Sequence, residues 1–428
     1  AISIKEKGLI HPVAVQRTPD SNKPFLLLAG GRRYSAVVFN DMKTIPTRVY
    51  PNELSELDRR EIELMENIQS EDLEWTEKVW LTTQIHELQT EKHGEAMGPS
   101  EGHSANDTAK LLGVSGMTVS RDRKLAQGLE KHGEALSIAK NESEALRTLK
   151  KLERIEKNEE AAHRFEEELR DDKGENRKKS LVNGYILGDF FEGVRQVPDN
   201  AVAFVEVDPP YAIDIKAKKF ARAAFQEDDL SWQQRENPLL DVYNEIDEAV
   251  YPEFLTKLFK ECYRVMHPGS WIIAWHAHQW KEQVINELTE AGFAPCSIPA
   301  LWAKSTPGQC LNPSRRLANS YESFIYASKD DGIIHQPGTA NVFQFTPISP
   351  EKKSHPTERP IEMLERLLDV FCRPGAHIMV PFLGSGNTML AAANKGTSAF
   401  GFDLAEDYRN AFVARVQTKM PGEYKSYE

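Results

Sequence analysis

The chain has 428 residues, of which 40% are hydrophobic and 28% charged, a composition typical of a globular protein with two or three domains. No apolar run reaches the ~18 residues of a membrane-spanning helix, and the first residues lack a secretory signal pattern. The four cysteines have no paired spacing, which argues against a zinc site and favours reduced thiols in a cytoplasmic protein. Because the net charge is −12, a nucleic-acid-binding surface must gather its basic residues locally.

The segment from residue 8 to residue 73 has the features of a small α+β domain. Two strand-like stretches, at 12–15 and 25–28, precede Ala29–Ala36, in which a glycine turn leads into a helix with two arginines. A helix start beside arginines favours a bound anion, because its free N–H groups and the guanidinium groups all donate hydrogen bonds. The stretch Leu64–Leu73 follows.

The stretches Ala29–Ala36 and Leu64–Leu73 resemble two motifs of the N-terminal domain of ParB partition proteins. The resemblance implies CTP and a second copy of the chain as candidate partners. Two residues depart from the family pattern: Gly31 replaces a usual acid, and Ser70 replaces a usual arginine. An adaptor that dimerises or contacts DNA without binding nucleotide is therefore the alternative.

Two helices joined by a glycine turn are expected after residue 103. Ser104 caps a helix at 106–112, Gly113 makes the turn, and Ser115 caps a second helix from residue 116 to about 129. This pattern indicates a helix-turn-helix, and the ParB-like segment before it favours double-stranded DNA as the partner over an ordinary helical hairpin. The outward positions of the second helix are the candidate DNA contacts: Thr118, Ser120, Arg121, Arg123 and Lys124.

An abrupt strand end organises the second half of the chain. The apolar run from Ala201 to Val207 ends in Asp208, Pro209, Pro210 and Tyr211. Such a run is typical of a buried strand in a parallel sheet, and ligands bind beyond the carboxyl ends of these strands. We expect Asp208 and the carbonyl of Pro209 to accept hydrogen bonds from the amino group of a base, with Tyr211 stacked on the ring. A plain structural turn is the alternative.

This tetrapeptide resembles the DPPY motif of DNA amino-methyltransferases, which use S-adenosylmethionine. The resemblance implies that Asp208, Pro209, Pro210 and Tyr211 are catalytic and act on a base that has left the duplex. It implies N6 of adenine as the acceptor. N4 of cytosine is the alternative, although that family more often begins the motif with serine.

A strand, a glycine turn and an alanine-rich helix follow over residues 378–394. Glycines let the backbone approach a ligand, and the helix start favours the cofactor's carboxylate. Asp403 ends the next strand, where such folds place an acid for ribose hydroxyls. The family usually has an acid where Val380 stands. The resemblance implies these cofactor-binding residues: Asp189, His355, Thr357, Phe382, Gly384, Ser385, Gly386, Thr388 and Asp403.

The order of the motifs, with DPPY before the glycine turn, is that of β-class, cell-cycle-type adenine methyltransferases. The resemblance covers residues 181–412, makes Arg315 and Arg316 candidate DNA contacts, and places target recognition between residues 327 and 355. Because that segment is short, we expect relaxed sequence specificity, or specificity supplied by the N-terminal half. Cys296 follows a proline, as a cytosine-C5 nucleophile does, but is expected to be a core thiol.

The predicted fold class is α/β: a Rossmann-like methyltransferase domain preceded by a small α+β ParB-like domain and a helical helix-turn-helix domain. The expected boundaries are 1–100 for the ParB/sulfiredoxin-like domain, 101–170 for the helical region, 171–180 for a linker and 181–428 for the methyltransferase domain. Residues 142–170 are expected to be a solvated helix or spacer. No metal is expected. A ParB-like partition protein with a decayed methyltransferase half is the other alternative. The combination suggests a phage or plasmid gene that protects DNA from restriction.

Overall fold

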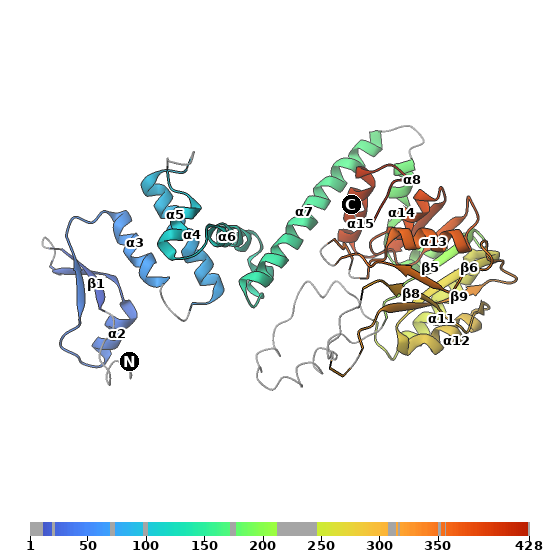
Figure 1. Cartoon of the computed structure of the whole chain (residues 1–428), viewed down its shortest axis with the longest axis horizontal. Coiled ribbons are helices and arrows are strands. Elements are labelled where there is room, and N and C mark those ends of the chain that lie inside the picture. Colours follow the sequence, from blue (N-terminus) through green and yellow to red (C-terminus); the bar gives the residue numbers. More distant parts are fainter. Residues whose placement is uncertain are drawn as a thin grey trace. The chain divides into compact units, whose positions relative to one another are not determined.

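The computed structural model describes residues 12–18, 22–68, 73–96, 102–171, 177–211, 246–306, 314–315, 317–349, 352–355 and 357–426. The chain divides into two compact units, residues 1–152 and 153–428 (Figure 1). The C-terminal unit contains the strand end and the glycine turn. Within the described residues, no helix is both long and apolar enough to cross a membrane.

The N-terminal unit begins with a three-stranded sheet. Strand β1 (Val13–Arg17) lies in the middle, antiparallel to β2 (Phe25–Ala29) and parallel to β3 (Thr47–Tyr50). Helices α2 (Gly31–Phe39) and α3 (Glu56–Asn67) complete this small α+β domain. The two predicted strands and the predicted arginine-bearing helix are therefore present.

Helical hairpins form the rest of this unit. Helix α4 (Trp75–His93) packs against α3 and α6, and α5 (Ala105–Leu112) packs against α6 (Gly116–Ser137). The side chain of Ser104 accepts a hydrogen bond from the N–H of Asp107, and Gly113 ends α5 with a φ of 68°. Ser115 caps α6, which continues past the expected end near residue 129. The local cap and turn signals thus predict the starts of both helices.

Helix α7 (Glu142–Asp171) differs from the expected solvated spacer. Its first turns bury Ala145 and Leu149 in the core of the N-terminal unit. Its later turns bury Ala162, Phe165 and Leu169 in the core of the C-terminal unit. The boundary between the two units therefore falls within this helix, at residues 152 and 153, and not at the linker expected near residue 171. The reason is an apolar stripe that lies among the many charged residues of the helix.

One large sheet forms the centre of the C-terminal unit, in the order β10-β8-β9-β6-β5-β11-β12-β4. Along this path β9 alone runs antiparallel to its neighbours, and a short strand, β7, pairs with it. The strand bounds are β4 (Tyr185–Leu187), β5 (Val202–Val207), β6 (Met266–His276), β7 (Ala294–Pro295), β8 (Ala300–Lys304), β9 (Tyr321–Ser328), β10 (Val342–Phe345), β11 (His377–Val380) and β12 (Ser398–Asp403).

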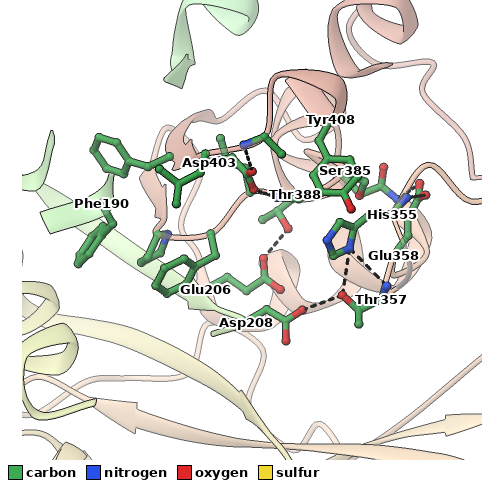
Figure 2. Close-up of a pocket in the computed structure, with 18 of the residues that line it drawn as sticks. Phe190, Glu206, Asp208, His355, Thr357, Glu358, Ser385, Thr388, Asp403 and Tyr408 are labelled. Carbon is green, nitrogen blue, oxygen red and sulfur yellow. Dashed lines mark hydrogen bonds between the residues drawn. The ribbon is translucent and has the colours of Figure 1, made fainter. Parts of the chain in front are cut away.

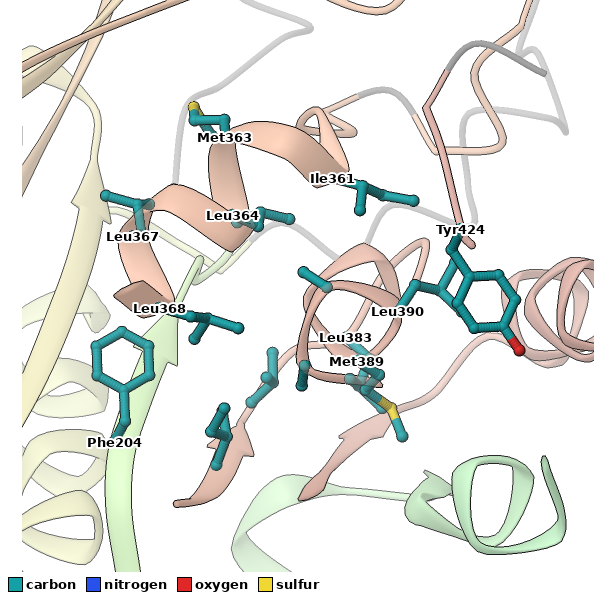
Figure 3. Close-up of a cluster of buried hydrophobic side chains, with 14 of the residues drawn as sticks. Phe204, Ile361, Met363, Leu364, Leu367, Leu368, Leu383, Met389, Leu390 and Tyr424 are labelled. Carbon is teal, nitrogen blue, oxygen red and sulfur yellow. The ribbon is translucent and has the colours of Figure 1, made fainter. Parts of the chain in front are cut away.

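Helices cover both faces of this sheet, because alternate strand residues enter two separate hydrophobic clusters. Phe204 of β5 and Ile378 of β11 join the cluster that includes α8, α13, α14 and α15, part of which is drawn in Figure 3. Val205 and Met379, the next residues, join the cluster of α9, α11 and α12. The helix bounds are α8 (Arg177–Gly184), α9 (Phe190–Gly193), η1 (Val194–Gln196), α11 (Tyr251–Val265), η4 (His278–Trp280), α12 (Lys281–Glu290), α13 (Ile361–Phe371), α14 (Asn387–Asn394) and α15 (Glu406–Thr418).

Strands β5 and β11 mark the switch point of the sheet. They are parallel neighbours, yet β5 is followed in sequence by β6 on one side and β11 by β12 on the other. A crevice forms outside the carboxyl ends of two strands arranged in this way, and open α/β sheets bind their ligands there. This doubly wound, largely parallel arrangement is the Rossmann-like fold expected from the sequence.

One expectation on a smaller segment needs correction. Cys296 is half-buried beside β9 and not a core thiol; its backbone N–H donates to the carbonyl oxygen of Tyr326. The segment between residues 327 and 355, the expected site of target recognition, contributes β10 to the edge of the sheet, beside β8.

We predict that Ser104→Ala weakens the start of α5. The alanine cannot accept the hydrogen bond from Asp107, and losing such a cap costs about 1 kcal/mol. Hydrogen exchange of the full chain should show faster exchange at the first amides of α5. Ser137→Ala, at an exposed serine that caps no helix start, is the control. Equal exchange at α5 in both variants would contradict the assigned cap.

Candidate functional site

A cavity lies outside the carboxyl ends of β5, β11 and β12, and it joins the strand end to the glycine turn (Figure 2). The predicted site residues that line it are Asp189, Asp208, Pro210, His355, Thr357, Phe382, Gly384, Ser385, Thr388 and Asp403. Pro209, Tyr211 and Gly386 lie in the same segments but do not line it. Two segments far apart in sequence thus meet at one cavity.

The glycine turn has a backbone that only glycine fits well. Gly384 and Gly386 have φ values of 51° and 71°, and a Cβ on Gly386 would lie 2.3 Å from the ring of Phe412. The carboxylate of Asp403 accepts a hydrogen bond from the N–H of Gly384 at 2.7 Å and another from Ala405 at 2.9 Å. Burial raises the pKa of Asp403. This carboxylate therefore holds the turn as well as facing the cavity.

Aromatic rings form the wall of the cavity next to Asp189. The ring of Phe190 lies 6.0 Å from that of Phe382 and 5.7 Å from that of Phe402, measured between centroids. Asp189 precedes them and accepts a hydrogen bond from the N–H of Glu192 at 3.1 Å, which starts α9. An apolar wall beside a carboxylate suits a flat ring that carries an amino group.

Asp208 lies in an ion pair that the sequence reasoning did not foresee. Both of its carboxylate oxygens accept hydrogen bonds from the guanidinium of Arg359, at 2.5 and 3.0 Å. The same guanidinium donates to Glu322 at 3.2 Å and lies 3.9 Å from the centre of the Trp275 ring. Burial lowers the pKa of Arg359, but Asp208 and the other acidic groups around it outweigh burial and raise it well above its usual value.

Tyr211 is oriented by Asp208 in this structure. Its hydroxyl donates to the carboxylate at 2.6 Å, and its ring packs against the hydrophobic cluster that contains α13 and α14. Burial raises the pKa of this phenol well above its usual value. Stacking of the ring on a base stays a prediction.

The segment before α13 closes one side of the cavity. The ring of His355 packs edge-on against Tyr408 at 4.6 Å between centroids, and burial lowers the pKa of His355. The hydroxyl of Thr357 lies 3.1 Å from Nδ1 of His355 and 3.5 Å from a carboxylate oxygen of Asp208. This segment therefore contacts the strand end directly.

Two lining residues, Glu206 and Arg359, had no role in the sequence analysis. Glu206 is 4% exposed, and an acid at a buried strand position is rare, so its place in an apolar run was an available signal. Arg359 has no local signal, because its partner Asp208 lies 151 residues away in sequence.

The candidate DNA contacts on α6 differ in their surroundings. Arg121 forms an ion pair with Glu142, so its guanidinium has a partner within the unit. The hydroxyl of Thr118 bonds that of Ser115, and the hydroxyl of Ser120 donates to the carbonyl oxygen of Gly116. Arg123 is half-buried, Lys124 and Arg315 are exposed, and Arg316 lies outside the described residues.

The two ParB-like motifs meet in space. The guanidinium of Arg33 forms an ion pair with Glu66 and donates to the carbonyl oxygen of Pro12 at 2.9 Å. Ser70 lies outside the described residues. An arginine already paired with an acid is less available to a nucleotide phosphate.

Comparison with known families gives two matches. The model described as "ParB N-terminal domain" matches residues 1–68, and the model described as "DNA methylase" matches residues 333–414. The second match includes the glycine turn and Asp403. Strand β5 and the Asp208 motif precede the match in sequence and lie outside it.

Individual relatives match different parts. "Putative methylase YubD" of Escherichia coli (strain K12) is 23% identical over 235 residues, which are 55% of this chain and 90% of that protein. The chromosome-partitioning protein ParB of Caulobacter vibrioides is 34% identical over 115 residues, 26% of this chain and 37% of that protein. The crystal structure of the M1.HpyAVI-SAM complex aligns with a TM-score of 0.40 and 17% identity, over 55% of this chain and 98% of that one. The chain is therefore similar to the ParB N-terminal domain over residues 1–68 and to DNA methylases of the N6/N4 type over residues 333–414.

Proposed function

We propose that the C-terminal unit transfers a methyl group from S-adenosylmethionine to N6 of adenine in double-stranded DNA. The observation that carries the proposal is the cavity at the β5/β11 switch point, which Asp208 and Pro210 line together with Gly384 and Ser385. A methyl donor at the glycine turn would lie beside an acceptor at the strand end. Positioning two reactants in this way supplies a large part of a transfer enzyme's rate.

The cofactor's adenosine would occupy the end of the cavity between the Phe190 wall and Asp403. Asp189 would accept from its amino group, and Asp403 from its ribose hydroxyls. The helix start at Gly386 offers free N–H groups to a carboxylate. Chains that bind a nucleoside in a Rossmann-like sheet place an acid at the end of the second strand in this manner.

The reaction requires no covalent intermediate on the protein. Nitrogen forms a bond to the methyl carbon, the carbon–sulfur bond breaks, and its electron pair stays on sulfur, which becomes a neutral thioether. The amine then releases one proton. Asp208 and the carbonyl of Pro209 would accept the two N–H bonds of the amine and raise its electron density before transfer.

Arg359 would fix the carboxylate of Asp208 for this step. A carboxylate has about four acceptor sites, so Asp208 can receive an amine while its bonds to Arg359 and Tyr211 persist. The guanidinium is 5% exposed and stacks on Trp275, so it has little freedom. Two bonds from Arg359 and one from Tyr211 would leave one acceptor site of the carboxylate, near the hydroxyl of Thr357, for the amine.

The proposed acceptor base is adenine. The motif begins with Asp208 and not with serine, which favours adenine over cytosine. The ParB-like and helix-turn-helix segments would hold DNA, with Ser120, Arg123 and Lys124 of α6 as the candidate contacts. A partition protein with an inactive methyltransferase half is the rival, and catalytic assays separate the two.

We predict that Asp208→Asn abolishes methyl transfer but leaves S-adenosylmethionine binding within about twofold, because Asp208 faces the acceptor. The assays are transfer of labelled methyl to DNA, mass spectrometry of the digested product and calorimetry with the cofactor. The wild-type product should contain N6-methyladenine. N4-methylcytosine would exclude the adenine assignment, and full activity of the variant would exclude the role of Asp208.

We predict that Arg359→Met lowers the free energy of unfolding by about 3–5 kcal/mol, because Asp208 and Glu322 lose their shared buried cation. Adding Asp208→Asn should recover part of this loss. Urea denaturation of both variants gives the values, and Arg373→Met, at an exposed arginine of the same unit, is the control. Strict additivity of the two changes would contradict a direct interaction.

We predict that removing residues 1–152 weakens DNA binding and broadens the set of methylated sites. The cut keeps Ala162, Phe165 and Leu169 of α7, which the core of the C-terminal unit needs. Methylation sequencing of DNA modified by both forms is the measurement. An unchanged single long motif, methylated to completion without the N-terminal unit, would show that specificity resides in the C-terminal unit alone.

A further inference from the structure

Glu206 is a buried acid near the carboxyl end of the otherwise apolar strand β5. One carboxylate oxygen accepts from the indole N–H of Trp275 at 2.9 Å, and the other bonds the hydroxyl of Thr388 at 2.5 Å. The side chain lines the cavity, where Figure 2 shows it between Asp403 and Asp208. None of the ion pairs found among the described residues includes Glu206. Burial raises the pKa of Glu206 and outweighs the guanidinium of Arg359, which lowers this pKa without forming an ion pair with Glu206. A buried carboxylate without a directly paired cation is costly unless a ligand supplies one.

The position of Glu206 also relates to Val380, the valine before the glycine turn, where the family usually has an acid. In the register of β5 and β11, Phe204 lies beside Ile378 and Val205 beside Met379. Glu206 and Val380 are the next residues along the two strands. Glu206 lies two residues after Phe204, and Val380 lies two residues after Ile378. Because alternate residues of a strand point to the same face, Glu206 and Val380 face the side of the sheet that carries the cluster of Phe204 and Ile378. The acid missing from β11 is thus present one strand away.

Glu206 is also close to the reacting end of the cavity. It precedes Asp208 by two residues on the same face of the chain, a separation of roughly 6.6 Å along a strand. Its partner Thr388 lies in the first turn of α14, directly after the glycine turn. Glu206 therefore lines the same cavity as the glycine turn and Asp208.

We propose that Glu206 is the carboxylate that receives the cationic methionine end of the cofactor. This inference rests on the proposed function, in which S-adenosylmethionine occupies the cavity. The cofactor carries a sulfonium and an ammonium group a few bonds apart, and either would supply the missing positive charge. In this role Glu206 does for this chain what an acid at position 380 would do.

The first test compares three ligands with wild-type protein and Glu206→Gln by calorimetry. S-adenosylmethionine has both cations, S-adenosylhomocysteine keeps only the ammonium, and methylthioadenosine has neither. Glutamine preserves the hydrogen-bonding shape, because the hydroxyl of Thr388 can turn to accept from the amide. We expect the variant to bind S-adenosylmethionine about ten- to hundredfold more weakly and methylthioadenosine equally well.

The affinity for S-adenosylhomocysteine identifies which cation Glu206 contacts. A similar loss for S-adenosylhomocysteine assigns the ammonium, and a loss confined to S-adenosylmethionine assigns the sulfonium. Unchanged affinity for S-adenosylmethionine, or an equal loss for methylthioadenosine, overturns the inference while leaving the proposed function intact. Failure of the wild type to bind any of the three overturns the proposed function itself. Glu253→Gln, at an exposed glutamate on α11, is the matched control.

A second test uses pH. Burial raises the pKa of Glu206, and a bound cation favours the ionised form. Affinity for S-adenosylmethionine should therefore rise as pH increases through that raised pKa and then level off. The other charged or titratable groups that face the cavity are unchanged in Glu206→Gln: Asp189, Asp208, His355, Glu358, Arg359, Asp403 and Tyr408. The same rise in the variant, or in methylthioadenosine binding, would overturn the assignment.

Discussion

Parallel hydrogen bonding between β5 and β11 is the constraint on which the candidate site depends. Strand β5 ends in the Asp208 motif, and strand β11 ends in the glycine turn. Paired, the two strands place the Asp208 motif and the glycine turn at the same edge of the sheet. The two hydrophobic clusters on either side fix this pairing, because Phe204 and Val205 are buried on opposite faces and a slip of one residue would exchange them.

The charge of the cavity indicates that the cofactor and the DNA backbone would be bound by different parts of the protein. Its lining includes five acids, Asp189, Glu206, Asp208, Glu358 and Asp403, but one arginine, Arg359. Such a surface attracts a sulfonium cofactor and repels phosphate groups. In the proposed function the DNA backbone would therefore be held outside the cavity, and only an uncharged base would enter it. This division agrees with an overall charge of −12 in a protein proposed to bind DNA.

Local patterns were the part of the structure that the sequence could predict. Ser104 and Ser115 mark helix starts, Gly384 and Gly386 mark a turn with positive φ, and the apolar run before Asp208 marks a buried strand, because each signal involves residues within a few positions. The Asp208–Arg359 pair could not be predicted, because it joins residues 151 positions apart. The buried stripe of α7 was readable at a spacing of three and four residues, but its charged neighbours concealed it.

The two hydrogen bonds of Asp403 have a consequence for mutational work on this site. One carboxylate both anchors the amide of Gly384 and faces the space proposed for a ribose. Replacing Asp403 would release the turn and remove a ligand contact in the same step. The measured loss of ligand affinity would combine the two effects, and no single variant can separate them. Ligand binding and the order of the turn are therefore linked: a bound ligand should stabilise the turn, and a more stable turn should raise ligand affinity. Hydrogen exchange at the amide of Gly384 would then report the fraction of the protein that has ligand bound.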